Sequence, residues 1–582
     1  MAVDQRTLAA AAAIAALVVT FAAACLVDAR THSLCNDEAK HLVTGFRVLE
    51  RRECCLGGDN APLTALFALP AWVAGATPLP GLKMGDPVHE AGHAWLFRQA
   101  DPERVLFAAR CLAIVLGVGM LVGIAALAWR HFGPLGAFAG VAAAACDPTV
   151  LGHFSLVSTD ALVAAAVIGC LAALDWWSAG PSPVRATGVG IALGLAFLAK
   201  FTAVAFGPAV VLWAWLHRRQ VAAPRVRSLT AQAVACAVAA ATTVWLGYGG
   251  HLSPRFPFFT LPGLATGLEQ SRIYAVGGMP SFFCGWLGRC HPGYFWFAPL
   301  VKLPIPLLAL WSLAAVVVLL TPVRKSPLAQ VAALAAACLF TAFAASRLCI
   351  GIRHLLPAFT LTALVVAAAA GAVPRLPALP RRIVACGIAG LLAWLAAEAA
   401  WTAPRHLSYF NQFAGGPRGG IHLLGDSNLD WGQDLKTLKK TMTTLGLDEV
   451  ILSYFGNTDP AFYGIRYQYL PKMLYAADHG DHVVDPRREV LAISVNNLQG
   501  TFLRNPNAYA WLHDREPFAT AGDSIWLFDI TGDAEAHARL QAIYWAAGCG
   551  RLAAAEAAKH RACARGDRRP DAGGNAPAIT ER

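Results

Sequence analysis

The chain has 582 residues, of which 56% are hydrophobic and only 14% are charged, whereas soluble globular proteins carry roughly 25% charged residues. This composition excludes an ordinary soluble protein and indicates a chain that is surrounded mostly by lipid. The formal net charge of +11 does not indicate nucleic-acid binding, because Lys and Arg gather in the cytoplasmic loops of membrane proteins and the sequence contains no DNA- or RNA-binding motif.

The first apolar run covers residues 7–27. It is longer than the roughly 7–15 apolar residues of a signal peptide, and Asp4 offsets the charge of Arg6 in front of it. We therefore expect an uncleaved first membrane helix rather than a cleaved signal peptide.

One later run, residues 187–216, is too long for a single crossing, because about 20 residues span the roughly 30 Å hydrocarbon layer. Arg185 before this run and Arg218 and Arg219 after it belong in the cytoplasm under the positive-inside rule. The run must then cross twice, with a break near Lys200 on the outer side. With the N-terminus inside, we expect a polytopic α-helical membrane protein of about eleven transmembrane helices, near residues 7–27, 105–129, 135–151, 160–177, 187–216 (two helices), 229–249, 299–320, 328–346, 355–373 and 383–401.

The same rule places three segments on the outer side of the membrane: 28–104, 250–298 and the residues from about 402 onward. In the first segment, Leu42, Phe46 and Leu49 recur at helical spacing. This pattern predicts an amphipathic juxtamembrane helix, and a second such helix is expected over residues 63–72.

The C-terminal part has a different pattern. Three runs, 449–455, 489–495 and 524–530, have the composition of strands, and residues 434–446 predict a helix capped by Asp434. Strands that alternate with helices predict a small α/β domain outside the membrane. We therefore divide the chain into a transmembrane domain, an extracytoplasmic α/β domain and a disordered polar tail, over residues 1–401, 402–566 and 567–582.

Fifteen cysteines are spread along the chain, and none of them forms a CxxC pair. This excludes a zinc ribbon and a thioredoxin-like motif. Cys284 and Cys290 lie in a polar segment, as do Cys54 and Cys55, and the sequence leaves the pairing of these outer cysteines open.

The stretch HEAGH, with His89, Glu90 and His93, matches the H-E-x-x-H pattern of zinc proteases. In that pattern two histidines one helical turn apart bind zinc, and the glutamate acts as a base. The stretch follows a Gly- and Pro-rich segment, and Gly92 lies within it. We therefore treat a membrane metalloprotease as an alternative to the main hypothesis.

Ionisable side chains interrupt or adjoin several apolar runs at their outer ends. The first of these stretches, NDEAKH, contains Asp37, Glu38 and His41 directly after the first apolar run. Such groups are costly in lipid, so by default they face a cavity or a partner, although single residues of this kind also snorkel to the membrane surface. The others are Asp160, Lys200, Lys302, Arg353 and His354.

Acids and cations that share one membrane face suit a transfer reaction on a lipid phosphate. A carboxylate can take the proton of an acceptor hydroxyl, while cations stabilise the departing phosphate. The lipid tail of such a donor would lie in the bilayer, and its sugar would lie between these groups.

Several stretches together resemble the glycosyltransferase-C superfamily, specifically the bacterial relatives of dolichyl-phosphate-mannose protein mannosyltransferases. Lipid A aminoarabinose transferases are similar proteins. The resemblance covers roughly residues 7 to 401, in the family's order, with NDEAKHLVTGFRVLE, NAPLTALFALP, GHFSLVSTDAL, GIALGLAFLAKFTAV, FAPLVKLPIPLL and IGIRHLLP.

The resemblance implies a role for each matching residue. Asp37 matches the catalytic base of the family, Glu38 matches its acidic neighbour, and Asp160 matches the second acidic position. Lys200 and Lys302 match basic positions beside the lipid phosphate. His41, Arg353 and His354 are expected to contribute to substrate binding. The segment that contains HEAGH aligns with a family segment that does not bind metal.

Residues 408–438 resemble a segment at the same place in many bacterial members of the family. They include the stretch DSNLDWGQD, whose polar residues could bind a sugar or the acceptor. A tight turn that leads into a helix explains the same Asp, Asn and Gly content. The residues concerned are Asp426, Asn428, Asp430, Trp431 and Gln433.

The sequence thus predicts an inverting glycosyltransferase of the inner membrane that uses a polyprenyl-phosphate sugar. Its acceptor would be a hydroxyl of a protein, lipid or glycan, and the active site and C-terminal domain would be periplasmic. We expect no tightly bound cofactor, and the sequence leaves open a divalent metal at the acidic pair. Besides the protease, a non-enzymatic transporter of lipid-linked sugars is the other alternative.

Overall fold

The computed structural model describes residues 5–51, 61–77, 88–217, 226–250, 253–255, 258–260, 262–472 and 480–566. The tail expected at 567–582, Cys54 and Cys55, and Arg218 and Arg219 lie outside these residues. The chain forms two compact units. The helical unit comprises Met1–Arg30, Asp37–Met279 and Arg289–Gly416, and the C-terminal unit comprises Thr31–Asn36, Pro280–Gly288 and Pro417–Arg582.

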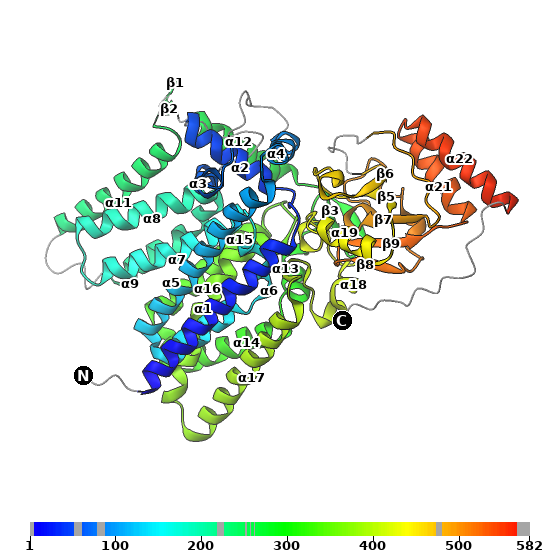
Figure 1. Cartoon of the computed structure of the whole chain (residues 1–582). Coiled ribbons are helices and arrows are strands. Elements are labelled where there is room, and N and C mark those ends of the chain that lie inside the picture. The colour runs from blue at the N-terminus through cyan, green and yellow to red at the C-terminus, as the bar shows by residue number, and fades with distance from the viewer. Residues whose placement is uncertain are drawn as a thin grey trace. The chain divides into compact units, whose positions relative to one another are not determined.

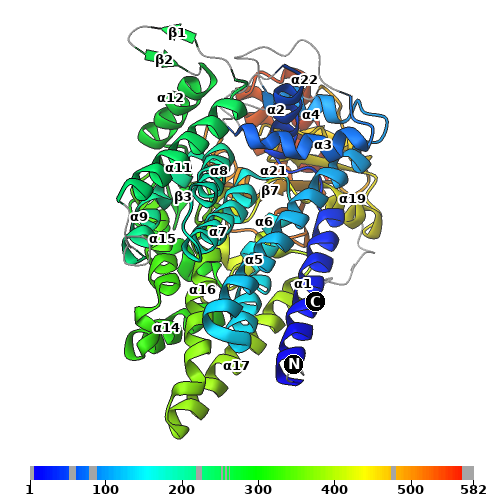
Figure 2. The ribbon, with the colours of Figure 1, turned by 90° about the vertical axis from the view of Figure 1, so that its left-hand side faces the viewer.

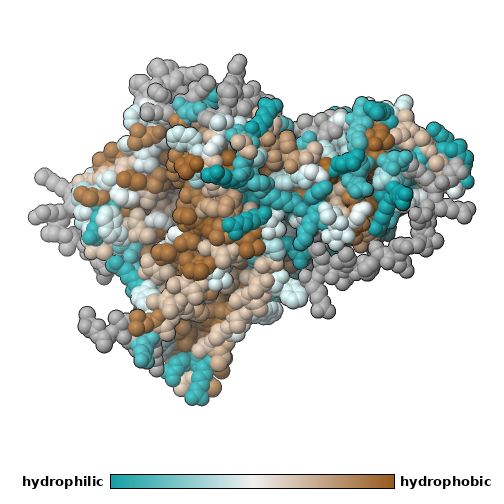
Figure 3. Space-filling model, viewed as in Figure 1, coloured by the Kyte–Doolittle hydropathy of each residue, from teal (hydrophilic) through white to brown (hydrophobic). Residues whose placement is uncertain are grey.

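The helical unit contains apolar helices of different lengths. They are α1 (Gln5–Thr31), α5 (Pro102–Ala145), α6 (Pro148–Phe154), α7 (Thr159–Ser178), α8 (Pro183–Ala199), α9 (Gly207–Leu216), α11 (Val226–Gly247), α13 (Tyr294–Lys302), α14 (Ile305–Leu320), α15 (Pro327–Ala344), α16 (Leu356–Ala372) and α17 (Ala378–Thr402). Many of them run alongside one another, with α8 packed against α7 and α11, and α16 packed against α5 (Figures 1 and 2). In Figure 3, hydrophobic residues cover much of the visible face of this unit.

Seven described helices are long and apolar enough to cross a membrane, and the bent pair α13–α14 adds an eighth candidate. α5 contains two helices joined across a kink at Gly133, whose φ is 79°. When α5 is taken as two helices, and α8 and the helix 201–216 are included, the apolar helical segments correspond to the eleven that the sequence predicts. The fold class expected from the sequence is thus confirmed.

The break expected near Lys200 is confirmed, because α8 ends at Ala199 and the 3-10 helix η2 (Phe201–Phe206) begins directly after it. Lys200 itself is extended, with φ −166° and ψ 136°. The span expected over 299–320 is wrong at its start, because α13 and α14 meet at an angle of 111°. Pro304 disfavours a helical conformation at Leu303, which is extended.

Short helices gather at one end of the helical unit, at the top of both views (Figures 1 and 2). They include α2 (Glu38–Arg51), α3 (Ala65–Val73), α4 (Val88–Leu96) and α12 (Pro262–Gly277), beside the hairpin of β1 (Ser253–Arg255) and β2 (Phe258–Thr260). The amphipathic helices expected near residues 42–49 and 63–72 correspond to α2 and α3. Leu42 and Phe46 are buried inside the protein, and the Phe46 ring lies 5.4 Å from that of Trp95 on α4.

The C-terminal unit is built on a mixed five-stranded sheet in the order β6-β5-β7-β9-β8. β5 is parallel to both β6 and β7, and the remaining pairs are antiparallel. The strands are β5 (Glu449–Ser453), β6 (Arg466–Tyr469), β7 (Val490–Ser494), β8 (Ala519–Ala521) and β9 (Ile525–Asp529), and a separate hairpin joins β3 (Ser281–Phe283) to β4 (Trp286–Gly288). The small α/β domain predicted from the sequence is therefore present.

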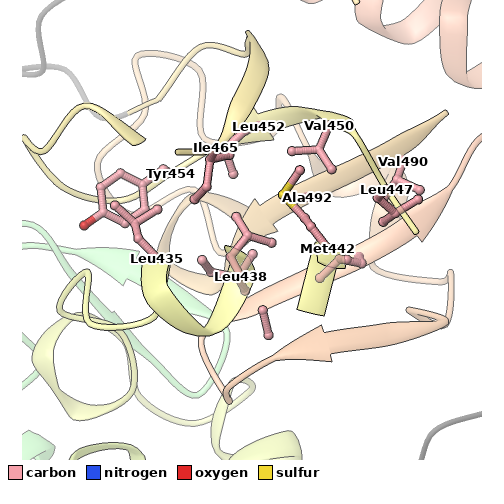
Figure 4. Close-up of a cluster of buried hydrophobic side chains, with 13 residues drawn as sticks. Leu435, Leu438, Met442, Leu447, Val450, Leu452, Tyr454, Ile465, Val490 and Ala492 are labelled. Carbon is pink, nitrogen blue, oxygen red and sulfur yellow. The ribbon is translucent and has the colours of Figure 1, made fainter. Parts of the chain in front are cut away.

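Helices cover both faces of this sheet. On one face, α19 (Leu435–Thr444) buries Leu438 and Met442 against Val450 and Val490, as Figure 4 shows. On the other face, Gln468 donates hydrogen bonds to side chains of α21 (Ala534–Ala546) and α22 (Gly550–Arg565). Truncating a buried Leu or Met in such a core costs about 2–5 kcal/mol.

Asp434 stands at the N-cap position of α19, as predicted, but its side chain does not cap the helix backbone. Its carboxylate instead accepts a hydrogen bond of 2.7 Å from the Ser524 hydroxyl. The predicted N-cap position is therefore correct, but the predicted capping by the side chain is wrong, because the Ser524 hydroxyl binds the Asp434 carboxylate instead.

Candidate active site

The ends of several helices in the helical unit bring ionisable residues together. Asp37 directly precedes α2, and Asp160 lies in the first turn of α7, where the Ser158 hydroxyl accepts a hydrogen bond from the Asp160 backbone N–H. Lys200 lies between α8 and η2, and Arg353 lies in the 3-10 helix η4 (Ile352–Leu355) before α16. Each side chain thus sits where a helix starts or breaks.

Arg353 bridges the two acids. Its guanidinium lies 3.2 Å from a carboxylate oxygen of Asp37 and 3.5 Å from one of Asp160. Asp160 also forms an ion pair with Lys200. The structure therefore gathers four of the residues singled out in the sequence.

His354 completes the Asp160 side of the site. Its Nδ1 atom lies 3.0 Å from the Lys200 ammonium and 3.7 Å from the Asp160 carboxylate. The ring stacks on Phe343 with 5.2 Å between ring centroids. An aromatic wall of this kind fixes the imidazole beside the ion pair.

Two further groups contact Asp37. The Lys40 ammonium lies 3.5 Å from its carboxylate, and His89 Nδ1 lies 3.9 Å away. Burial alone would raise the pKa of Asp37, but the charges of Lys40 and Arg353, followed by those of His89 and His41, hold the pKa well below its usual value. His41 is buried one turn into α2, and its backbone N–H donates to the Asp37 carbonyl oxygen.

We name Asp37, Lys40, Asp160, Lys200, Arg353 and His354 the charged cluster. Its two carboxylates face the three basic side chains of Lys40, Lys200 and Arg353, which gives an excess of basic groups over acidic ones. A group of this kind is arranged to receive an anion.

Glu38 has a different environment from Asp37. Arg110 of α5 donates to both of its carboxylate oxygens, with 2.8 Å from Nε to one of them, and the Val157 backbone N–H donates to the same oxygen at 3.0 Å. Arg110 also donates to the carbonyl oxygen of Ala29 at the end of α1. Glu38 therefore ties α1, α2, α5 and the start of α7 together, so its structural setting is that of a positioning residue.

Lys302 makes its contacts with the segment that follows α17. Its ammonium donates to the Leu407 carbonyl oxygen at 3.3 Å and lies 4.5 Å from the centroid of the Phe410 ring. Buried His153 on α6 lies within electrostatic range of Lys302, Asp160 and Arg353.

The HEAGH stretch does form a helix, α4, but without a metal-ligand set around it. No group of three or more His, Cys, Asp or Glu side chains in the described part of the chain is arranged to hold a metal ion. A Cβ atom at Gly92 would lie 3.0 Å from the backbone of Ala39. Gly92 therefore allows α4 to approach α2 closely, which places His89 beside Asp37.

Sequence reasoning missed three contributors to this region. Arg110 interrupts the apolar run 105–129, so the rule that selected Asp160 would also have found it. His89 was considered only as a zinc ligand. A disulfide joins Cys290 to Cys349, four residues before Arg353, and no spacing rule predicts such a pair.

The comparisons with known proteins agree with the resemblance predicted from the sequence. Residues 100–245 match the model of the family described as dolichyl-phosphate-mannose-protein mannosyltransferase. This range contains Arg110, Asp160 and Lys200, so the resemblance is confirmed over the part of the chain that supplies the Asp160–Lys200 ion pair.

Two solved structures are similar to the chain. ArnT from Cupriavidus metallidurans bound to undecaprenyl phosphate is 13% identical, with a TM-score of 0.44 over 89% of this chain and 97% of that chain. The apo state of the same protein is 13% identical, with a TM-score of 0.41 over 90% of this chain and 98% of that chain. No curated protein sequence matches the chain.

Proposed function

We propose that this chain is a membrane glycosyltransferase that transfers a sugar from a polyprenyl-phosphate carrier to an acceptor hydroxyl, with inversion at the anomeric carbon. The charged cluster carries the proposal, because two carboxylates bridged by Arg353 lie beside Lys200 at the ends of apolar helices. The family match over residues 100–245 supports it. The acceptor would be a protein, a lipid or a glycan.

In this reaction the acceptor oxygen attacks the anomeric carbon from the side opposite the phosphate. A bond forms between these two atoms, and the bond from the anomeric carbon to the phosphate oxygen breaks. The electron pair of the broken bond stays on the lipid phosphate, and the hydroxyl proton passes to Asp37. General base catalysis of this type contributes typically about 10²–10⁴-fold.

The cations explain how a carboxylate with a depressed pKa can serve as the base. In the structure, Arg353 pairs with Asp37 and Asp160. When Arg353 and Lys200 turn to the donor phosphate, Asp37 loses a cationic neighbour and gains an anionic one. Both changes raise its pKa. Donor binding would therefore strengthen the base at the moment when the base is needed.

We place the site on the periplasmic face. Arg185 lies in the first turn of α8, and Lys200 follows its last residue. In the same way, Arg353 precedes α16, and Arg375 follows it in the 3-10 helix η5 (Val373–Arg375). In both cases the site residue and the basic loop residue lie at opposite ends of the helix. The positive-inside rule assigns the loop ends to the cytoplasm, which leaves the charged cluster outside.

We expect no tightly bound cofactor. Transfer should survive treatment with a metal chelator, and its loss would assign a divalent ion to the acidic pair.

The decisive experiment measures sugar released from a polyprenyl-phosphate sugar by the purified chain in lipid nanodiscs with membrane acceptors. Wild type should transfer the sugar, and Asp37→Asn should not. A transporter would keep its activity in Asp37→Asn, since Asn preserves the shape of the side chain. A protease would instead lose activity in the His89→Ala, His93→Ala double variant and would contain zinc.

A further inference from the structure

The six residues before Asp37 belong to the C-terminal unit, although they follow the first transmembrane helix. Thr31–Asn36 cluster with Pro417–Arg582, whereas Asp37 begins the next part of the helical unit. Ser33, Leu34 and Cys35 are fully buried. The chain that leads to the proposed base is therefore packed inside the C-terminal unit.

The carbonyl oxygens of one loop hold this segment. The backbone N–H groups of Ser33 and Asn36 donate to the carbonyl oxygens of Gln433 at 2.9 Å and Trp431 at 3.0 Å. The Ser33 hydroxyl donates to the Gly432 carbonyl oxygen at 2.9 Å and accepts from the Leu435 N–H at 3.1 Å.

Two side chains from elsewhere in the C-terminal unit add to this hold. The Tyr463 hydroxyl accepts a hydrogen bond of 2.9 Å from the Leu34 N–H. The Asn457 amide donates to the Asn36 side-chain oxygen at 3.0 Å. Hydrogen bonds thus hold Ser33, Leu34 and Asn36, the last of which directly precedes Asp37.

The polar residues of the DSNLDWGQD stretch shape the loop. Asp430 accepts from the Gly432 N–H at 3.0 Å, and the Gln433 side-chain oxygen accepts from the Trp431 N–H at 2.7 Å. The Gln433 amide donates to the Leu429 carbonyl oxygen at 2.9 Å, and Asn496 donates to the carbonyl oxygen of Asp430 at 2.7 Å. These contacts favour the tight-turn interpretation of the stretch over sugar binding, because the side chains bind the loop's own backbone.

Gly432 is required at the centre of the loop. Its φ is +82°, and a Cβ atom there would lie 2.5 Å from the Tyr454 hydroxyl oxygen and 3.0 Å from the Phe455 carbonyl oxygen. The Tyr454 hydroxyl donates to the Gly432 carbonyl oxygen at 2.8 Å. The oxygen that receives the Ser33 hydroxyl is therefore fixed from a second direction.

We propose that the loop 429–435 holds residues 33–36 and thereby positions Asp37 for proton transfer. We name this loop the clamp loop. Its catalytic consequence rests on the proposed glycosyltransferase function, whereas its hold on residues 33–36 does not. Because Asp37 is bonded directly to Asn36, an error in the path of this segment passes to the base, and a 1 Å misplacement of a reacting group can cost about 10²-fold in rate.

Two buried serines provide a matched test. Ser33 donates one hydrogen bond to residues 429–435 and accepts another from them, whereas Ser453 donates to the Pro471 carbonyl oxygen and accepts from the Asn497 amide, neither of which belongs to that loop or to residues 33–36. Both are fully buried. Ser33→Ala should lower kcat about 10- to 100-fold with the KM for the donor unchanged. Both variants should lower the unfolding temperature to a similar extent, because each loses two buried hydrogen bonds. Ser453→Ala, however, should keep kcat within about twofold.

Asp430 supplies a second test with a conservative rescue. Burial raises the pKa of Asp430 to about 8, so at neutral pH its side chain is a neutral acceptor for the Gly432 N–H. Asp430→Asn retains that acceptor and should keep kcat, whereas Asp430→Ala should resemble Ser33→Ala. Equal losses of kcat in Ser33→Ala and Ser453→Ala would overturn the proposal, as would a normal kcat in Asp430→Ala.

Hydrogen exchange separates this inference from the function. Amide exchange of residues 33–36 in nanodiscs should accelerate in Ser33→Ala and Asp430→Ala, but not in Asp430→Asn or Ser453→Ala. Unchanged exchange in the first two variants contradicts the clamp. If wild type transfers no sugar, the proposed function fails, and these exchange rates alone decide whether the clamp loop holds the segment.

Discussion

Each unit contains a largely buried group of several charged side chains, and these two groups differ in their charge balance. In the C-terminal unit, Glu489 and Glu556 pair with His537 and Lys559, with distances of 2.7 to 3.3 Å. Burial lowers the pKa of His537, but the hydrogen bonds that its ring donates to both glutamates raise it to about 9, so the imidazole is charged at neutral pH. Two negative charges there face two positive ones.

The charged cluster of the helical unit has three basic side chains, those of Lys40, Lys200 and Arg353, for two carboxylates. The buried group of the C-terminal unit has equal numbers of negative and positive charges, so it does not attract a further ion. We expect it to hold α21 and α22 on the sheet. A group with excess positive charge is stabilised further by an incoming anion. We therefore propose that the sum of charges, rather than burial, distinguishes the ion network of the C-terminal unit from the proposed binding site of the helical unit.

Asp37→Asn should have the largest effect on activity. The amide cannot accept the proton, so kcat should fall by at least about 10²–10⁴-fold, while donor binding persists. Asp175→Asn is the matched control, because Asp175 lies on α7 and pairs with His131 at 2.8 Å, far along the helix from Asp160. An active Asp37→Asn enzyme would show that the charged cluster is not the catalytic site.

Lys200→Ala should come next, and it should exceed Lys302→Ala. Loss of one contact to a developing negative charge costs about 10²–10³-fold in kcat, and Lys200 belongs to the charged cluster. Lys302 already donates to the Leu407 carbonyl oxygen, so removing it should cost less. Lys200→Arg should rescue only in part, because a planar guanidinium differs from a point charge. Steady-state transfer rates check the order, and the reverse order would mean that the phosphate lies near Lys302.

Glu38→Gln should act mainly on stability. It leaves the buried Arg110 guanidinium facing a neutral amide, and breaking a buried ion pair costs about 3–5 kcal/mol. The double variant Glu38→Gln, Arg110→Gln should regain part of the lost unfolding temperature. The folded fraction should transfer sugar more slowly than wild type but far faster than Asp37→Asn. A stable, inactive Glu38→Gln variant would instead make Glu38 a direct participant.

Much of the helical unit follows from local sequence, whereas the surroundings of the site do not. The length of each apolar run and the basic loops predicted the break at Lys200 and the helical segments. The charge of Asp37 within NDEAKH marked the site, but nothing local shows that Arg353, more than 300 residues later, would bridge it to Asp160. The hold of the clamp loop on Ser33 is equally remote, because the Ser33 N–H and hydroxyl donate to backbone carbonyl oxygens about 400 residues away, and such oxygens carry no pairing signal in the sequence. Contacts of this kind depend on the assembled fold.

The smallest expected effect on activity is at His537, where the comparison predicts a change in stability alone. The folded pKa of His537 is about 9, above the unfolded value of about 6.5. Its contribution to stability is therefore complete below pH 6.5 and is lost as the pH rises through 9.

His537→Gln should lower the unfolding temperature at pH 6.5, and the difference in unfolding temperature between the variant and wild type should shrink by pH 9.5. Asp430, whose raised pKa of about 8 also makes stability fall with rising pH, is present in both proteins, so the difference between the two curves reports His537. At pH 7 the folded variant should keep kcat within about twofold, since His537 pairs with Glu489 and Glu556 inside the C-terminal unit. A constant difference across the pH range, or a loss of kcat as large as that of Lys200→Ala, would show that the two groups of charges do not differ in role.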